Sequence, residues 1–430
     1  MEQQHADLRQ TYVLQAFYIQ LYLGYYSSIS RKIEMAESNS MLGVTLLRRG
    51  KMLQSQGYFP PEHFLSLSNV PLHEQWQKWL EQETRIRLVY FAFTLDAHIS
   101  ASRNINPMLP YSEMETPLPV VRKLWEAESA VKWREVLMSE VNLRVRQAPS
   151  LCMILRQPSP MSAQMVSLDV TCSSMALLAG IWGMVHEFQQ MSLVVRPSKS
   201  SNDFVLNSRF QDLNSIVEQI NCDIADQDNK VDVGVPVLQA FIGLHLNVSF
   251  YEISKYAGIG TDEDAQQAIS YVQNWFDSPQ SRHALWNAGQ IFRTTRSLPA
   301  GSLTDIYVIA LYHAAVTLWV WALLFWAQGS FVGGSTAEVA LDGEETGAVS
   351  KFLKVSKALP GLTTSSGTFV SLKELTAAPD LARDVIAANW RNEPLPLTAE
   401  EVSRLMQGIS NLCKQRFGAL SAENPLAQTL

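Results

Sequence analysis

The sequence is poor in cysteine, and its cysteines are not arranged to bind a metal. Only four occur in 430 residues, far apart and without a Cys-x-x-Cys pair or a Cys/His spacing suited to zinc. They are Cys152, Cys172, Cys222 and Cys413. Such a set is typical of buried thiols in a reducing intracellular compartment. The sequence therefore predicts neither a disulfide framework nor a zinc site.

An excess of positive charge is also absent. The formal net charge is -7, and the 34 Lys and Arg residues are scattered along the chain. The densest basic cluster, residues 48–51, is typical of a solvated helix face. Because binding to a phosphate backbone depends on clustered basic residues, we expect no direct nucleic-acid binding by this chain.

The common catalytic and nucleotide-binding motifs are missing as well. The sequence contains no Gly-x-Gly-x-x-Gly, P-loop or Gly-x-Ser-x-Gly pattern. His73-Glu74 and His186-Glu187 each lack the second histidine of a His-Glu-x-x-His zinc motif. We therefore expect no enzyme activity and no catalytic, cofactor-binding or metal-binding residue.

Apolar and aromatic residues, in contrast, are plentiful. They make up 47% of the chain and include eleven Trp, so a large packed core is expected. The longest apolar run, residues 306–327, is interrupted only by His313 and Thr317 and is long enough to span a bilayer. No basic residue follows it closely, as membrane spans usually require. A buried central helix is favoured, with a membrane-associated regulator as the alternative.

Helix-start signals recur, whereas strand signals are nearly absent. The predicted starts are Ser278-Pro279, Thr261 to Asp264, Ser302 to Asp305, Ser371 to Glu374 and Thr398 to Glu401. The segment 339–343 is at most a short extended piece. We predict an all-α fold, a large multi-helix body of two packed lobes. Residues 1–150 form the first lobe, residues 151–328 the second with a long buried helix near 303–328, and residues 329–430 a C-terminal helical extension.

The segment 76–96 is the most informative stretch. Trp76 and Trp79 fall at helical spacing, and Glu81/Arg85 and Glu83/Arg87 are acid-first pairs four residues apart. The segment then becomes apolar on nearly every side, which a helix tolerates only inside a larger packed body.

This segment, together with others, resembles the helical regulatory region of fungal zinc-finger transcription factors. The similarity is to the fungal-specific transcription factor domain, in the branch whose members usually carry two-Cys, two-His zinc fingers. Further similar segments are Gln15-Ala16-Phe17, Asn106-Pro107, Leu118-Pro119, Leu124-Trp125, Trp133, Tyr256-Ala257-Gly258, Arg282 to Gln290, Ala310 to Ala315, Leu341 to Gly343 and Pro394 to Leu397.

The resemblance implies a nuclear transcription regulator whose DNA-binding zinc module is missing from this chain. Such a chain would control gene expression through protein partners, which are the transcription machinery or a related factor, including homo- or hetero-dimers. Three mechanisms stay open: a truncated product, a co-regulator, or a chain that titrates a full-length relative. A secondary-metabolite gene cluster is one target that the resemblance suggests.

A helical enzyme of the terpene-cyclase type is the rival interpretation. It would bind magnesium through clustered acids, for which Asp262-Glu263-Asp264 and Asp226/Asp228 are the nearest candidates. The first group is better explained as acids in a helix first turn, and the second as a polar loop.

Other polar side chains favour structural roles. His245, His283 and His313 are expected to be core histidines rather than metal ligands. Arg85 and Arg87 are expected to form intrahelical pairs rather than to bind an anionic effector. Asp96, if buried, should find a hydrogen-bond donor. Six tryptophans are expected in the core, with a ligand pocket between some of them as the alternative: Trp76, Trp79, Trp125, Trp133, Trp286 and Trp319.

Overall fold

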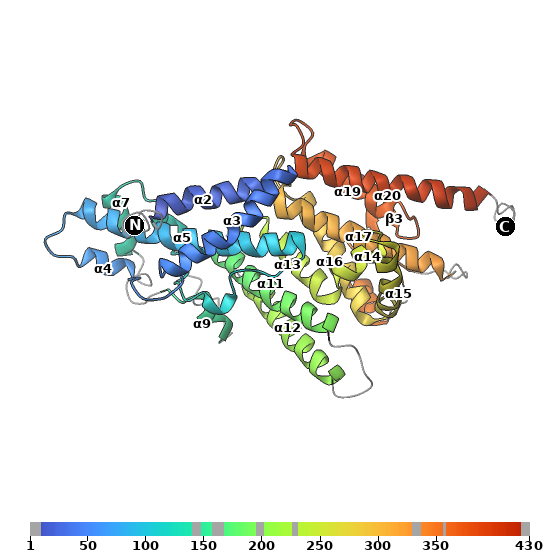
Figure 1. Cartoon of the computed structure of the whole chain (residues 1–430), viewed down its shortest axis with the longest axis horizontal. Coiled ribbons are helices and arrows are strands. Elements are labelled where there is room, and N and C mark those ends of the chain that lie inside the picture. The colour runs from blue at the N-terminus through green and yellow to red at the C-terminus, as the bar shows by residue number, and fades with distance from the viewer. Residues whose placement is uncertain are drawn as a thin grey trace. The chain divides into compact units, whose positions relative to one another are not determined.

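The protein forms two compact units, Met1–Val235 (unit 1) and Pro236–Leu430 (unit 2). The computed structural model describes residues 10–139, 148–156, 167–194, 202–225, 231–328, 337–355 and 358–422. These residues are mainly helical, as Figure 1 shows, so the predicted all-α fold class is confirmed. The predicted division of the chain at residues 150 and 328 stays a prediction. The contacts within the structure divide the chain at one place, after Val235.

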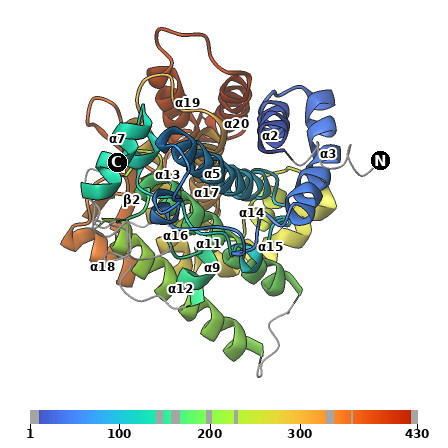
Figure 2. The ribbon, with the colours of Figure 1, turned by 90° about the vertical axis from the view of Figure 1, so that its left-hand side faces the viewer.

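Unit 1 is built around one long helix, α5 (Leu72–Arg103). The other elements are α2 (Thr11–Tyr25), α3 (Ser30–Arg49), α4 (Pro61–Leu65), the 3-10 helix η1 (Tyr111–Glu113), α6 (Arg122–Trp125), α7 (Ala130–Ser139), α9 (Leu151–Arg156), α11 (Val170–Val194) and α12 (Asn202–Ala225). Helices α2, α4, α7 and α11 all pack directly on α5. Figure 2 looks nearly along α5, with α2 and α3 side by side.

The sequence explains where α5 ends and which part of it is buried. Pro71 precedes its first turn, and Asn104 ends it in the left-handed conformation, with φ of 53°. Asparagine adopts this conformation at helix ends more readily than most residues do. From Leu88 onward most side chains are buried, so the second half of α5 forms the core of unit 1.

The first half of α5 supports a tryptophan-centred cluster. Trp79 and Trp133 are fully buried, with ring centroids 5.6 Å apart. Phe64 and Leu124 belong to the same cluster, and Trp76 packs against its edge. Large aromatic side chains dominate the energetics of such cores. The predicted core position is therefore confirmed for Trp79 and Trp133.

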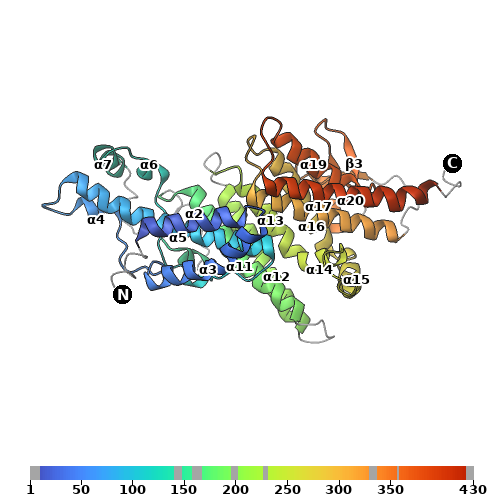
Figure 3. The ribbon, with the colours of Figure 1, turned by 45° about the horizontal axis from the view of Figure 1, so that its top comes forward.

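Unit 2 is built around the apolar helix α17 (Asp305–Ala327). Its other helices are α13 (Val235–Asn247), α14 (Phe250–Tyr256), α15 (Asp262–Phe276), α16 (Pro279–Arg296), α18 (Gly347–Val355), α19 (Ala377–Asn389) and α20 (Leu397–Ala422). Figure 3 shows α17 among α16, α19 and α20, on which it packs. In the described part of the chain, α17 alone is long and apolar enough to cross a membrane, but 78% of its most apolar window is buried. The predicted buried central helix is therefore what the structure shows.

Two predicted helix starts are confirmed by their caps. Thr261 and Asp264 bond each other's backbone N–H groups in a capping box at the start of α15. Ser278 accepts a hydrogen bond from the N–H of Ser281, and Pro279 occupies the first position of α16. These patterns are local in sequence, which is why they could be recognised without the fold.

Three predicted starts are wrong in position. Helix α17 begins at Asp305, so Ser302 does not cap it. Helix α20 begins at Leu397, so Thr398 already lies inside it. Ser371 is the last residue of a strand rather than a helix cap. Four-residue capping patterns are short, and tertiary contacts decide which of them are used.

Unit 2 also contains a small sheet. The sequence predicted only one short extended piece of it, the segment 339–343. The sheet has the order β1-β2-β3, formed by β1 (Ala337–Ala340), β2 (Ala358–Thr363) and β3 (Phe369–Ser371). Strand β2 is parallel to β1, with Ala337 opposite Ala358, and antiparallel to β3, with Gly361 opposite Ser371. The strands are too short to show an alternating pattern, and Pro360 and Gly361 are unfavourable strand residues.

Candidate functional site

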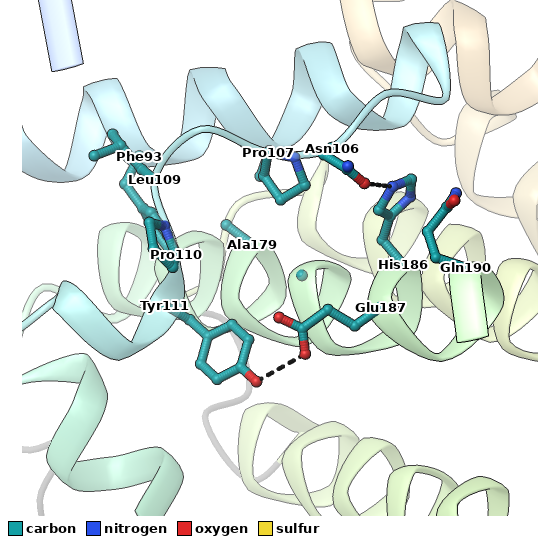
Figure 4. Close-up of a pocket in the computed structure, with 12 residues that line it drawn as sticks. Phe93, Asn106, Pro107, Leu109, Pro110, Tyr111, Ala179, His186, Glu187 and Gln190 are labelled. Carbon is teal, nitrogen blue, oxygen red and sulfur yellow. Dashed lines mark hydrogen bonds between the residues drawn. The ribbon is translucent and has the colours of Figure 1, made fainter. Parts of the chain in front are cut away.

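Unit 1 contains a pocket of about 350 Å³ between the second half of α5, the segment that follows α5, and α11. Figure 4 shows its walls. The lining residues are Phe93, Ala97, Asn106, Pro107, Leu109, Pro110, Tyr111, Ala179, Gly183, His186, Glu187 and Gln190. Concave, mostly apolar pockets with a few polar groups are typical of small-molecule sites.

Hydrogen bonds with side chains of α5 and α11 hold the segment that covers the pocket. The Ser100 hydroxyl donates to the carbonyl of Ile105 at 2.6 Å, and the Trp182 indole donates to that hydroxyl at 2.9 Å. Asp96 accepts from the backbone N–H groups of Met108 and Leu109, both at 2.8 Å. The covering segment is thereby fixed to both α5 and α11.

Asp96 is the titratable side chain that holds this segment through hydrogen bonds. Burial raises its pKa from 3.8 to about 6, while the backbone N–H groups of Leu109 and Met108 lower it in part. The sequence predicted that a buried Asp96 would find a donor, and this is confirmed.

Two polar pairs complete the pocket wall (Figure 4). His186 Nε2 lies 2.9 Å from Asn106 Oδ1, and the Tyr111 hydroxyl donates to Glu187 Oε2 at 3.1 Å. Burial lowers the pKa of His186, which favours the neutral imidazole. Burial and the Glu187 carboxylate raise the pKa of Tyr111, so its hydroxyl stays protonated. The arrangement offers hydrogen-bonding groups around an apolar floor.

The sequence did not place a site here. His186-Glu187 was interpreted only as an incomplete zinc motif. Asn106, the partner of His186, lies 80 residues away in the chain, and Tyr111, the partner of Glu187, lies 76 residues away. The six tryptophans considered for a ligand pocket do not line it. Within the described residues, no group of three or more His, Cys, Asp or Glu is placed to hold a metal.

A second polar cluster in unit 1 surrounds Arg87. Its guanidinium is 3.0 Å from Glu83 Oε1 and 2.9 Å from Asp169 Oδ2, and it donates to the carbonyl of Val120 at 3.0 Å. The guanidinium also lies 4.7 Å from the ring centroid of Trp125. Burial raises the pKa of Glu83 to about 7, an effect that Arg87 and the Val120 N–H partly offset. This cluster links α5 to the start of α11.

The predicted intrahelical pair of Glu83 with Arg87 is thus confirmed. The other predicted pair is Glu81 with Arg85. The structure describes both residues and shows no ion pair between them. No pattern in the sequence indicated Asp169, because it is 82 residues distant from Arg87.

The histidines considered as a trio separate into two groups. His245 and His313 are buried in unit 2, where their ring nitrogens lie 2.9 Å apart, and Phe250 stacks on His313. Burial, with His245 as a neighbour, lowers the pKa of His313. His283 is exposed on α16, so the predicted core position is correct for two residues and wrong for His283.

The acidic candidates of the enzyme interpretation do not converge. Asp262, Glu263 and Asp264 occupy the first turn of α15, where Asp264 completes the capping box. Acids in this position are stabilised by the helix dipole. Asp226 and Asp228 lie outside the described residues.

Comparison with known proteins decides the family. The model of the fungal specific transcription factor domain matches residues 6–220, half of the chain. The chain belongs to the fungal specific transcription factor domain family. All residues that line the pocket fall within the matched range, so the pocket is part of this domain.

Relatives of this domain carry names consistent with the family. The chain is 23% identical over 380 residues to transcription factor 1 of Elsinoe fawcettii. This match covers 84% of this chain and 39% of that protein. It is 23% identical over 334 residues to transcription factor PfmaH of Pestalotiopsis fici, which covers 71% of this chain and 33% of that protein. A shorter match, 34% over 67 residues, is to zinc finger protein zas1 of Schizosaccharomyces pombe, and covers 15% of this chain and 8% of that protein.

The chain therefore spans about two fifths or less of these relatives' length. No solved structure matches it. The recognition of the family from the tryptophan-bearing segment is confirmed, and family membership agrees with a role in transcription regulation.

Proposed function

We propose that this chain regulates transcription as a folded helical domain that acts in the nucleus through protein partners. The observation that carries the proposal is the family match over residues 6–220, a range that includes all of α5. The net charge of -7 supports partner contacts rather than contacts with DNA phosphates. The partners proposed are the transcription machinery or a related factor, and the target genes proposed are those of a secondary-metabolite cluster.

The proposal is tested by joining the full chain to a heterologous DNA-binding domain and measuring a reporter gene. The fusion is expected to change reporter transcription, whereas the bare chain is expected not to shift DNA in a gel mobility assay. Tight, sequence-specific DNA binding by the bare chain would contradict the second expectation.

Two substitutions on α7 make this test specific to the folded domain. Trp133 is fully buried in the tryptophan cluster, and Val131, two residues earlier, is exposed. Trp133→Ala is expected to cost about 3–5 kcal/mol of stability and to abolish the reporter effect. Val131→Ala is expected to leave the effect intact. If both fusions behave like the unsubstituted one at equal protein levels, the folded domain is not what acts.

A further inference from the structure

The pocket on α5 and α11 has the size and the composition of a small-molecule site. Its volume of about 350 Å³ lies at the lower end of the range of about 300–1,000 Å³ that ligand pockets occupy. Phe93, Pro107, Leu109 and Ala179 give it an apolar floor. A small ligand with one ring or a short apolar chain fits such a space better than a large one.

Hydrogen bonds within the protein hold the walls of the pocket in place. Its cover is fixed through Asp96, Ser100 and the bond between Asn106 and His186. On α11, Gly183 leaves room for the Tyr111 ring, since a Cβ atom there would lie 3.1 Å from Tyr111 Cδ1. Binding therefore needs little ordering of the protein, which lowers its entropic cost.

The charged group of the pocket is a hydrogen-bond acceptor. Glu187 is the one formally charged side chain among the lining residues, which include no Lys or Arg. Tyr111 donates to Glu187 Oε2, and in the described part of the chain no hydrogen bond reaches Oε1. An anion placed here would meet the Glu187 carboxylate, and Arg209, whose charge acts on Tyr111, is not among the lining residues, so the pocket disfavours anions.

We propose that this pocket binds a small, largely apolar molecule that ends in an amine or a hydroxyl group and donates a hydrogen bond to Glu187. The apolar part lies against Phe93, Leu109 and Ala179, and the polar end faces Glu187 at the exposed side of α11. This proposal does not depend on the proposed function, because binding is measured on the protein alone.

Three probes with one ring and different end groups test the proposal on the full chain. They are phenethylamine, 2-phenylethanol and phenylacetate, which end in an ammonium, a hydroxyl and a carboxylate. Ligand-observed saturation-transfer NMR, titrated to obtain Kd, is expected to rank phenethylamine first and phenylacetate last. Equal or tighter binding of phenylacetate overturns the assignment of Glu187, and no binding of any probe overturns the ligand class.

Matched substitutions locate the binding. Glu187 is exposed, so Glu187→Gln is expected to fold normally and to weaken phenethylamine about threefold to fivefold, with little effect on 2-phenylethanol. Glu128→Gln, at an exposed acid outside the pocket, is expected to change nothing. Ala179→Leu fills the floor and is expected to weaken the ammonium and hydroxyl probes together. The proposal fails if Glu187→Gln and Glu128→Gln give the same Kd values.

Discussion

Asp96 is a partly buried carboxyl whose raised pKa links the stability of the domain to pH. It belongs to α5 and accepts hydrogen bonds from the N–H groups of Met108 and Leu109 in the segment that covers the pocket. Burial raises its folded-state pKa to about 6, above the ordinary value of 3.8. The folded protein therefore binds this proton more tightly than the unfolded chain does, which stabilises the fold below pH 4. That contribution is lost as the pH rises to about 6.

We predict that Asp96→Asn removes this pH dependence. Between pH 4 and pH 7 the wild-type free energy of unfolding should fall relative to the variant by up to about 3 kcal/mol. Urea denaturation at a series of pH values measures the difference. Asp212→Asn, at an exposed position on α12, is the control and should follow the wild-type curve. Parallel curves for wild type and Asp96→Asn would show that Asp96 does not titrate in this range.

Single residues were predictable from the sequence where their partners are close along the chain. Glu83 and Arg87 are four residues apart, so one helical turn brings them together. Asp169 completes the same cluster but is 82 residues from Arg87. The pocket could not be predicted for the same reason, because no pattern in one stretch of sequence predicts that Asn106 will contact His186.

Among the elements, α16 is held unusually close to the turn after β1. A Cβ atom on Gly289 would overlap the backbone carbonyl of Leu341. The next residue, Gln290, donates to the carbonyls of Leu341 and Gly343 at 2.8 and 3.0 Å. Close approach of a helix to another backbone requires glycine, because any side chain would separate them.

Two glycine substitutions in unit 2 should therefore have opposite effects. Gly289→Ala is expected to lower stability by about 1–3 kcal/mol or more, because the backbone of Leu341 cannot easily move away. Gly408→Ala, on the exposed side of α20 with nothing within 4 Å of a new Cβ, should raise stability by about 0.5–1 kcal/mol. Differential scanning calorimetry should show the same transition moved down and up, respectively. An unchanged or higher transition temperature for Gly289→Ala would contradict the close approach.

Helices were predicted more completely than strands for a physical reason. The caps at Thr261 and Ser278 and the apolar run of α17 depend on neighbouring residues, which the sequence shows directly. Strands β1 to β3 have three to six residues each and gain their stability from pairing with each other. Such pairing depends on the fold, so local sequence cannot reveal it.

At the scale of the whole molecule, the helix α17 could lie either in a membrane or in the core of unit 2. By length and composition α17 resembles a membrane span, with a mean hydropathy of 2.0 in its most apolar window. Helices α14, α15, α16, α19 and α20 of unit 2 pack on it, and His245 of α13 contacts its His313. A helix that is apolar on all sides is stable in water only when such neighbours bury it. Folding of unit 2 therefore decides whether this segment meets lipid.

The same 23 residues should consequently behave in opposite ways inside and outside the fold. We predict that the full chain, expressed in cells, is released from the membrane pellet by an alkaline carbonate wash. Residues 305–327 alone, fused to a water-soluble reporter protein, should remain in the washed pellet because nothing buries them. Immunoblots of pellet and supernatant measure both. If the full chain also resists the wash while the unfused reporter is released, α17 contacts lipid in the folded protein and its assignment as the core of unit 2 is wrong.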